Sequence, residues 1–470
     1  MTDLNAMQLE QLDRPTKIKP MHLLMVSSMV FGMFFGAGNL IFPVHLGQLA
    51  GGNWLVAGLG FAISGGLLPL LAILAVVVTK SDGLYDLAKP VGGWYAGLFL
   101  VLVHLTIGPF FGTPRTAATA FEMAAKPFLS EQYYTLGMFL FSAVFFLAAY
   151  FLTIHPTKLV KYVGKYLNNI FLVLLAIIFL IAFLNPMGNT NHAATELYQS
   201  NSLISGFLEG YNTVDAVALL ALSVTFVHSV RDLGYREKHV RQLTARSGFI
   251  ALGVEMLIYF GLILLGTMSL SSLKLSDNGG TALSAIVTHY LGNLGTAFLG
   301  VLVTLGVFTT AMGLVVSFAQ DFHKLFPKVS YLTWLRVTTF ISFVVANAQL
   351  DNIIQWSLPV LMLLYPLSLA LILLSLTKNF FHGNHLVYKI TILFTALPAV
   401  FDMLNATPAV ISQSFLVKPL LDFYHTYFPL ANLGLGWLVP TLAAYFLTSV
   451  FVLLRQKQNV TINVNDVEAN

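Results

Sequence analysis

Long apolar runs recur along the whole chain, and they limit its possible folds more than any other feature. A helix that crosses a bilayer needs about 20 mostly apolar residues. Of the 470 residues, 57% are apolar and 9% are charged, whereas soluble domains carry about 25% charged residues. The sequence therefore predicts an all-α polytopic membrane protein and excludes a large water-soluble catalytic domain.

Twelve of these runs are predicted to be transmembrane helices. They cover residues 23–47, 54–78, 93–122, 136–154, 166–184, 203–230, 249–270, 294–319, 332–346, 353–376, 387–404 and 433–454. An even number of spans places both termini on the same side of the membrane.

The basic residues indicate which side that is, because cytoplasmic loops collect Lys and Arg. With the N-terminus inside, the outer segments keep only four of the 24 Lys and Arg residues, namely Arg115, Lys126, Lys274 and Lys418. This bias predicts that both termini are cytoplasmic. It also supports the twelve spans independently of hydropathy, since one missed span would abolish the alternation.

The first predicted helix contains residues that would interrupt it in mid-membrane. Gly32, Gly36 and Gly38 precede Asn39, and Pro43 follows near the outer end. Glycines in membrane helices often let two backbones approach closely, so close packing is one interpretation. The other is an unwound segment whose free N–H and C=O groups face a cavity. Asn39 favours the unwound segment, because a buried amide needs partners and a ligand site supplies them.

The sixth predicted helix has a matching interruption. Glu209 and Asp215 flank Gly210, Asn212 and Thr213 ahead of an apolar run. One charged side chain at mid-membrane costs roughly 2.5–3.5 kcal/mol on the insertion scale, so two acids in one span indicate a function. The alternative is that both acids lie in the outer headgroup region and begin the helix there.

The two interruptions lie five spans apart. This odd offset means that the second unit of five helices is inverted relative to the first, which is typical of transporters with a binding site at the membrane midplane. The N–H groups of a half-helix attract a carboxylate, whereas unwound carbonyls and acidic side chains attract an ammonium group or a metal cation. A zwitterionic amino acid satisfies both requirements.

Further polar side chains occur inside apolar helices. Thr309 and Thr310 supply the hard oxygen atoms that Na⁺ prefers, although an intramembrane Thr commonly bonds back to its own helix. Glu255 is either a proton carrier or a structural partner, so Asp215 and Glu255 leave H⁺ coupling open while the Thr pair favours Na⁺. Arg115 is either a snorkelling or structurally paired residue or an outer gate.

Four segments of the chain form a recognisable set: Phe34-Phe35-Gly36-Ala37-Gly38-Asn39-Leu40-Ile41-Phe42-Pro43, Gly108-Pro109-Phe110-Phe111-Gly112-Thr113-Pro114-Arg115-Thr116-Ala117, Glu209-Gly210-Tyr211-Asn212-Thr213-Val214-Asp215 and Thr309-Thr310-Ala311-Met312-Gly313. With these segments the chain resembles the branched-chain amino acid:cation symporter family. The resemblance covers essentially the whole chain. It implies a symporter of the bacterial inner membrane that imports leucine, isoleucine and valine.

The resemblance also implies a LeuT-type core of five plus five inverted helices, followed by two more. The corresponding segments are an N-terminal tail (1–22), the first repeat (23–200), the second repeat (201–380), two additional helices with an interfacial segment (381–455) and a C-terminal tail (456–470).

The same resemblance assigns roles to individual residues. Gly36, Ala37, Gly38 and Asn39, which resemble the Gly-x-Gly-Asn motif of sodium symporters, would hold the substrate carboxylate, and Glu209, Gly210, Tyr211 and Asn212 would hold its amino group. The Na⁺ site would consist of the carbonyl groups of Gly32, Phe35 and Gly306 and the hydroxyl groups of Thr309 and Thr310.

Other features exclude competing functions. The chain contains no cysteine, which excludes disulfides and thiolate metal sites. The net charge of +4 is too small to suggest nucleic-acid binding. The sequence contains no serine-hydrolase elbow, zinc-protease helix or phosphate loop, so we expect neither an enzyme nor a cofactor beyond the coupling ion, and no obligate protein partner. A channel or a carrier of another small solute is the alternative.

Overall fold

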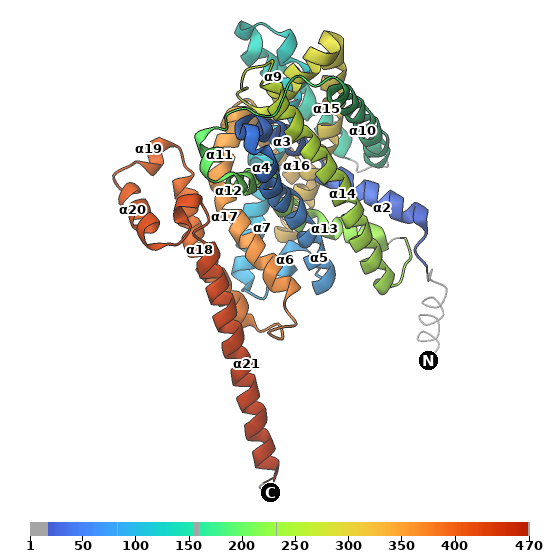
Figure 1. Cartoon of the computed structure of the whole chain (residues 1–470). Coiled ribbons are helices and arrows are strands. Elements are labelled where there is room, and N and C mark those ends of the chain that lie inside the picture. Colours follow the sequence, from blue (N-terminus) through green and yellow to red (C-terminus); the bar gives the residue numbers. More distant parts are fainter. Residues whose placement is uncertain (1–16, 82, 155–158, 232, 469–470) are drawn as a thin grey trace, which may run out of the picture. The chain divides into compact units, whose positions relative to one another are not determined.

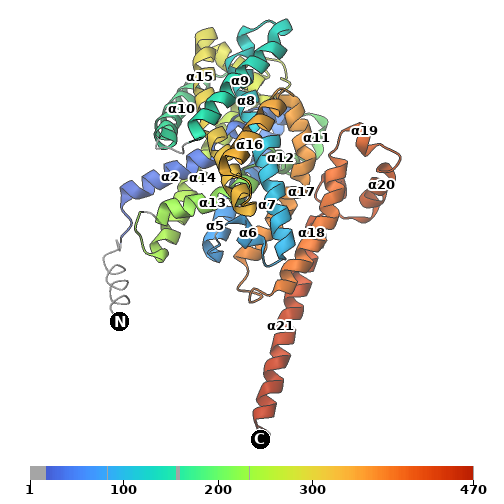
Figure 2. The same cartoon turned by 180° about the vertical axis from the view of Figure 1, so that it is seen from behind.

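The computed structural model describes residues 17–81, 83–154, 159–231 and 233–468. All regular elements in these ranges are helices, as Figures 1 and 2 show, which confirms the predicted all-α class. In the same ranges, eight helical segments are long and apolar enough to cross a membrane. Residues 1–16 of the predicted N-terminal tail lie outside the described residues.

Helical elements cover each predicted span. In chain order they are α2 (Pro20–Phe34), α3 (Ala37–Ala50), α4 (Trp54–Ala62), η2 (Ile63–Leu67), α5 (Leu68–Thr79), α7 (Gly93–Leu105), η3 (Thr106–Phe110), α8 (Gly112–Ala124), α9 (Tyr134–Thr153), α10 (Leu159–Leu184), α12 (Ser202–Glu209), η6 (Gly210–Thr213), α13 (Asp215–Arg231), α14 (Glu237–Ser269), α15 (Gly279–Leu325), α16 (Tyr331–Ala346), α17 (Leu350–Leu376), α18 (His385–Asn405) and α21 (Leu438–Glu468). Shorter elements connect them: η1 (Gly51–Asn53), α6 (Leu84–Ala88), η4 (Lys126–Phe128), η5 (Glu131–Tyr133), α11 (Glu196–Ser200), α19 (Ala409–Ser412), α20 (Lys418–Tyr427) and η7 (Ala431–Leu433).

Several of the predicted spans depart from regular α-helix inside the membrane. The first is broken between α2 and α3, and the sixth between α12 and α13. The second and third contain the π-helical turns η2 and η3. In η3, Pro109 follows Gly108, and a proline cannot donate the backbone hydrogen bond that a regular helix requires. Such wide turns occur frequently at functional sites.

The helices form two compact units. The first contains residues 1–70 and 101–357, and within it α3 packs against α14, α4 against α12 and α8 against α15. Two glycines allow the closest of these approaches. A Cβ atom on Gly60 of α4 would lie 1.9 Å from the Leu203 carbonyl oxygen, and one on Gly206 of α12 would lie 1.9 Å from the Ala57 carbonyl oxygen. The backbones of α4 and α12 therefore touch, as small residues permit in membrane helices.

The second unit contains residues 71–100 and 358–470. In it α18 packs against α21, and α19 and α20 lie in the connection between them. α21 continues to Glu468, so most of the segment expected as a C-terminal tail is helical.

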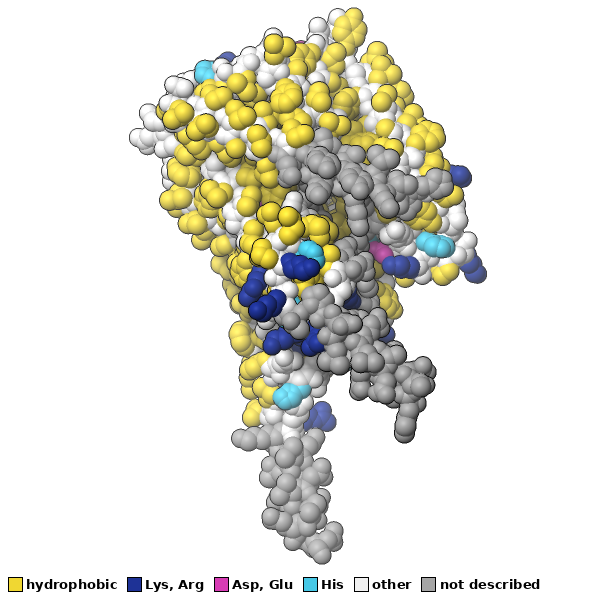
Figure 3. Space-filling view, turned by 90° about the vertical axis from the view of Figure 1, so that its right-hand side faces the viewer, with side chains coloured by type: hydrophobic (Ala, Val, Ile, Leu, Met, Phe, Trp, Pro, Cys, Tyr) yellow, Lys and Arg dark blue, Asp and Glu magenta, His cyan; other side chains and the backbone are white. Residues whose placement is uncertain are grey.

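Large apolar side chains are exposed on many of the described helices. Figure 3 shows one face on which hydrophobic side chains cover most of the described area, and the visible Lys and Arg side chains lie mainly on its lower part. A surface of this kind requires lipid around it, because soluble proteins do not expose large contiguous apolar areas.

Candidate functional site

The first predicted helix unwinds at two residues. Phe35 has φ −78° and ψ 91°, Gly36 has φ −108° and ψ −167°, and α3 begins at Ala37. The side chain of Asn39 caps this new helix, since its Oδ1 accepts a hydrogen bond from the Gly36 N–H at 2.9 Å. The predicted break therefore exists. Close packing is also present, because a Cβ atom on Gly38 would lie 3.1 Å from the Cα atom of Thr213.

The sixth predicted helix breaks where the sequence suggested. After α12 the chain forms the 3₁₀ turn η6, and Val214 then adopts a left-handed conformation with φ 68° before α13 begins at Asp215. This conformation is costly for a β-branched residue, and such strain often marks functional sites. The Nδ2 atom of Asn212 donates to a Glu209 oxygen at 3.3 Å inside this break.

The two breaks meet at a cluster of polar side chains built around Asn39. The Nδ2 atom of Asn39 lies 2.6 Å from Asp215 Oδ2, 3.1 Å from Glu255 Oε1 and 2.5 Å from the Tyr259 hydroxyl. All four side chains are buried. Asn39 and Asp215 occupy the first turns of α3 and α13, whereas Glu255 and Tyr259 belong to α14.

Tyr259 is the member of this cluster that sequence reasoning missed. Its hydroxyl donates to Glu255 Oε1 at 2.7 Å and lies 3.3 Å from the carbonyl oxygen of Gly65 in the π-turn η2. The available signal was its position four residues after Glu255, which puts both side chains on one helix face. The cluster thus involves three of the irregular segments in the membrane.

The electrostatics of the cluster call for a compensating positive charge. Asp215 and Glu255 are two buried carboxyl groups that share one amide donor, and such groups do not both ionise without a nearby cation. Among the described residues, no hydrogen-bond partner faces Glu255 Oε2. The arrangement can therefore hold a proton or a small metal cation.

Arg115 lies at a junction of several helices. Its guanidinium donates to the carbonyl oxygen of Asn212 in η6 and, at 2.9 Å, to the Ser357 hydroxyl in α17. It also lies 5.3 Å from the centre of the Phe42 ring on α3. Arg115 therefore connects α8 to the break in the sixth helix, to α17 and to α3. This makes it more than a snorkelling end residue, because its side chain is buried.

The residues of the predicted Na⁺ site are partly brought together. The Thr309 hydroxyl donates to the Gly306 carbonyl oxygen of its own helix at 2.7 Å, the common arrangement for an intramembrane Thr. The Thr310 methyl carbon would lie 3.8 Å from a Cβ atom on Gly36, so Thr310 faces the break that follows Phe35. The full site, which also includes Gly32, stays a prediction.

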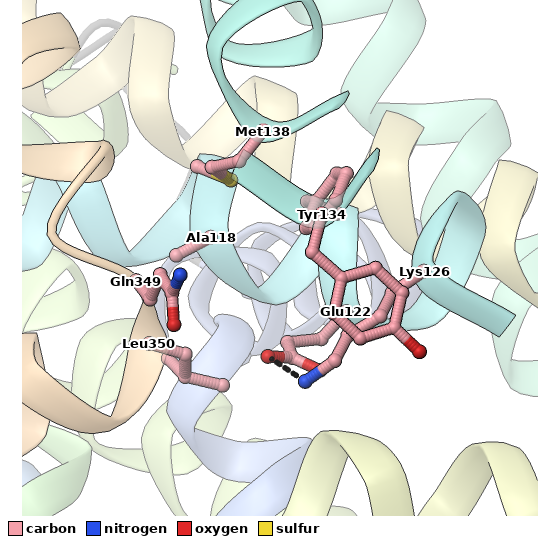
Figure 4. A pocket seen from close by; sticks show the side chains of 8 residues that line it. Ala118, Glu122, Lys126, Tyr134, Met138, Gln349 and Leu350 are labelled. Carbon is pink, nitrogen blue, oxygen red and sulfur yellow. Dashed lines mark hydrogen bonds and ion pairs between the residues drawn. The ribbon is translucent and has the colours of Figure 1, made fainter. Parts of the chain in front are cut away.

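A small pocket lies apart from the Asn39 cluster. It has a volume of about 20 Å³, room for roughly one water molecule. Its lining residues are Ala118, Phe121, Glu122, Lys126, Tyr134, Met138, Gln349 and Leu350. Figure 4 shows the ion pair inside it, in which Lys126 Nζ lies 2.8 Å from Glu122. The pocket is too small for an amino acid, and its charges are already paired.

A pairing between buried His104 and half-buried Asp321 was not foreseen. The Nε2 atom of His104 lies 2.9 Å from Asp321 Oδ2, joining α7 to α15 just before the π-turn η3. The two residues are far apart in the sequence, and neither stands in a recognisable motif.

The architecture is similar to solved membrane transporters. The chain superposes on the inward-facing conformation of Mhp1 with a TM-score of 0.58 at 10% identity, covering 94% of this chain and 96% of that one. It superposes on MhsT in complex with L-phenylalanine with a TM-score of 0.56 at 14% identity, covering 94% and 99%. The fold is therefore that of LeuT-type transporters, as the sequence resemblance implied.

Sequence comparison then gives the family. A family model described as branched-chain amino acid transport protein matches residues 19–455. The branched-chain amino acid permease BrnQ of Lactobacillus delbrueckii subsp. lactis is 39% identical over 93% of this chain and 98% of that protein. The permease BraB of Bacillus subtilis is 36% identical over 92% and 95%. The chain belongs to the branched-chain amino acid transport protein family, and the expectation of a transporter and not an enzyme is confirmed.

Proposed function

We propose that this protein is a secondary symporter that imports leucine, isoleucine and valine across the bacterial inner membrane by alternating access. The observation that carries the proposal is the meeting of two helix breaks, α2 to α3 and α12 to α13, at the Asn39 cluster in a member of this family. Transporters of this kind bind substrate where discontinuous helices cross. The proposed topology has twelve spans, five plus five inverted and two more, with both termini cytoplasmic.

The substrate carboxylate is proposed to bind at the start of α3. The main-chain N–H groups of Ala37 and Gly38 are in the first turn of that helix, where anions are stabilised. Gly36 and Asn39 are already bonded to each other, so in this arrangement Asn39 orients the binding turn.

The amino group is proposed to bind at the break in the sixth helix. Glu209, Gly210, Tyr211 and Asn212 end α12 or form η6, where carbonyl groups leave the regular helix pattern. Gly38 lies against Thr213 at the end of η6, which supports one site formed by both breaks. An apolar side chain gains about 1.5–3 kcal/mol from burial, so the three aliphatic substrates would share one apolar pocket.

Two locations are proposed for the coupling ion. Na⁺ is favoured and would bind among Gly32, Phe35, Gly306, Thr309 and Thr310. Thr310 beside the first break supports this location. The pair Asp215 and Glu255 is the alternative, where H⁺ would neutralise the shared negative charge.

Arg115 is proposed as an outer gate. Its bonds to Asn212 and Ser357 hold η6 against α17. The N–H groups of a guanidinium have a fixed relative geometry. The two hydrogen bonds of Arg115 can therefore break and re-form together during the transport cycle.

The test is uptake of radiolabelled isoleucine by purified protein in liposomes. Separate samples receive an inward Na⁺ gradient, an inward proton gradient or neither. Accumulation with Na⁺ alone supports the Thr310 site, and accumulation with protons alone supports the acid pair. Active protein that shows no uphill uptake under either gradient contradicts the symport proposal. A channel or a carrier of another solute is distinguished by counterflow, because unlabelled isoleucine on the far side accelerates uptake only through a carrier of isoleucine.

A further inference from the structure

We propose that α20 is an interfacial helix that inserts one apolar stripe between phospholipids at the membrane–water boundary. The segment of residues 406–437 connects α18 to α21, and parts of both helices are long and apolar enough to span a membrane. The two helices pack against each other, with the Thr441 hydroxyl donating to that of Thr395 at 2.9 Å. The connection therefore leaves and re-enters the bilayer at the same face. Figure 1 shows α19 and α20 as short helices beside the end of α18.

The residues of α20 divide into three stripes. Leu421 and Tyr424, one turn apart, are buried against the protein. The apolar side chains of Leu420, Phe423 and Tyr427 recur at helical spacing and are exposed, Phe423 by 54% and Tyr427 by 70%. Residues at this spacing share one face of a helix.

The third stripe is polar. Lys418, Asp422 and Thr426 follow one another at intervals of four residues and are exposed. At 3.6 residues per turn, this stripe lies about 130° around the helix from the exposed apolar stripe. A helix with this distribution places its apolar stripe in the acyl-chain boundary while the polar stripe faces water.

Contacts of α20 with α18 and with the segment before α21 determine which side chains of α20 point outward. The ring of Tyr424 stacks on Phe401 of α18 with ring centres 5.0 Å apart. The ring of Tyr424 also packs closely against the backbone at Gly436, in the segment that leads into α21. Gly436 is required for this approach, because a Cβ atom there would lie 2.0 Å from the Tyr424 oxygen. The apolar stripe is therefore held in a defined direction.

Lipid is the occupant that fits this stripe. Both flanking helices are candidate spans with exposed apolar side chains, and Leu397 of α18 and Phe446 of α21, which are more than half exposed, face acyl chains when these helices cross the bilayer. Phe415, just before α20, is 91% exposed. Aromatic side chains at the boundary of the bilayer are typical anchors of membrane proteins.

The absence of cysteine from the sequence makes a direct test practical. Single variants Phe423→Cys, Tyr427→Cys, Asp422→Cys and Thr426→Cys are labelled with a nitroxide in proteoliposomes, and collision with oxygen, which concentrates in lipid, is compared with collision with water-soluble NiEDDA. Phe446→Cys in α21 gives the reference for lipid. Each labelled variant is first shown to retain isoleucine uptake.

The expected result is that the preferred collision partner of the label, oxygen or NiEDDA, differs between neighbouring residues of α20. Labels at 423 and 427 should collide more often with oxygen, as the label at 446 does, whereas labels at 422 and 426 should collide more often with NiEDDA. Dominant NiEDDA collisions at all four positions would overturn the proposal in favour of a solvated loop. Low collision rates at 423 and 427, together with spin–spin broadening between molecules, would indicate that a second copy of the chain covers the stripe. That result would also overturn the proposal.

Discussion

The amide nitrogen of Asn39 lies 2.6 Å from an oxygen of Asp215, which joins the first turn of α3 to the first turn of α13. The same nitrogen reaches Glu255 on α14. One neutral side chain thus holds two buried acids at the crossing of the broken helices. Any change in the charge of these acids acts directly on the backbone breaks that are proposed to bind substrate.

Replacing Glu255 by Gln should flatten the pH dependence of isoleucine uptake. The amide imitates the protonated acid but cannot release a proton. Initial uptake rates in proteoliposomes at a series of pH values measure the effect. Glu122→Gln is the matched control, since Glu122 is also buried but pairs with Lys126. An unchanged pH profile in Glu255→Gln would exclude this residue as a proton carrier.

Replacing Asn39 by Ala should lower the stability of the protein by about 1–3 kcal/mol, the usual cost of leaving buried polar groups without their donor. The measurement is thermal unfolding of the purified variant in detergent. Asn352→Ala provides the comparison, because that exposed side chain donates to the Ala348 carbonyl oxygen in the turn just before α17. Equal melting temperatures for the two variants would show that the cluster contributes little to stability.

Replacing Thr310 by Ala should raise the Na⁺ concentration for half-maximal uptake by about tenfold, since a lost bond to a charged group is worth roughly 1.5–3 kcal/mol. Thr304→Ala is the control, as Thr304 lies on the same helix and bonds back to Gly300. The proposed Na⁺ location would be abandoned if both variants responded to Na⁺ as the unaltered protein does.

Replacing Arg115 by Lys should reduce uptake strongly, by about tenfold, even though the charge is kept. A lysine cannot donate in a fork to both Asn212 and Ser357. Ser357→Ala, which removes one of these bonds, should have a smaller effect, and Lys126→Ala in the short turn η4 after α8 should have none. Normal uptake and counterflow in Arg115→Ala would remove the gate proposal.

Replacing Gly38 by Ala should impair transport, although alanine favours helices by about 1 kcal/mol over glycine. The added methyl group would lie 3.1 Å from Thr213 and 3.3 Å from the ring of Phe42, forcing α3 away from η6. Gly313→Ala is the matched control, because among the described residues no heavy atom beyond the neighbouring backbone of its own helix lies within 4 Å of the added methyl group. The close-contact interpretation predicts that uptake falls only in the first variant, and equal uptake in both would refute it.

Much of the fold follows from local patterns in the sequence. Apolar runs predict the helices, because only a helix satisfies its own backbone hydrogen bonds in lipid. The positions of Gly36, Asn39 and Gly210 predict where two helices are interrupted, since glycine and asparagine favour an irregular backbone. The π-turns η2 and η3 were not predicted. The structure shows that they contain Gly65 and Pro109, respectively.

The sequence by itself determined that the chain is a helical membrane protein with two interrupted spans and a few intramembrane polar residues. Only the tertiary structure decided which of these residues meet. Asn39, Asp215 and Glu255 are separated by long stretches of chain, and Tyr259 was not singled out from the sequence. Their contact depends on how each helix is rotated about its axis and which helix lies beside it. Those quantities come from the packing of all the helices together, which no local pattern encodes.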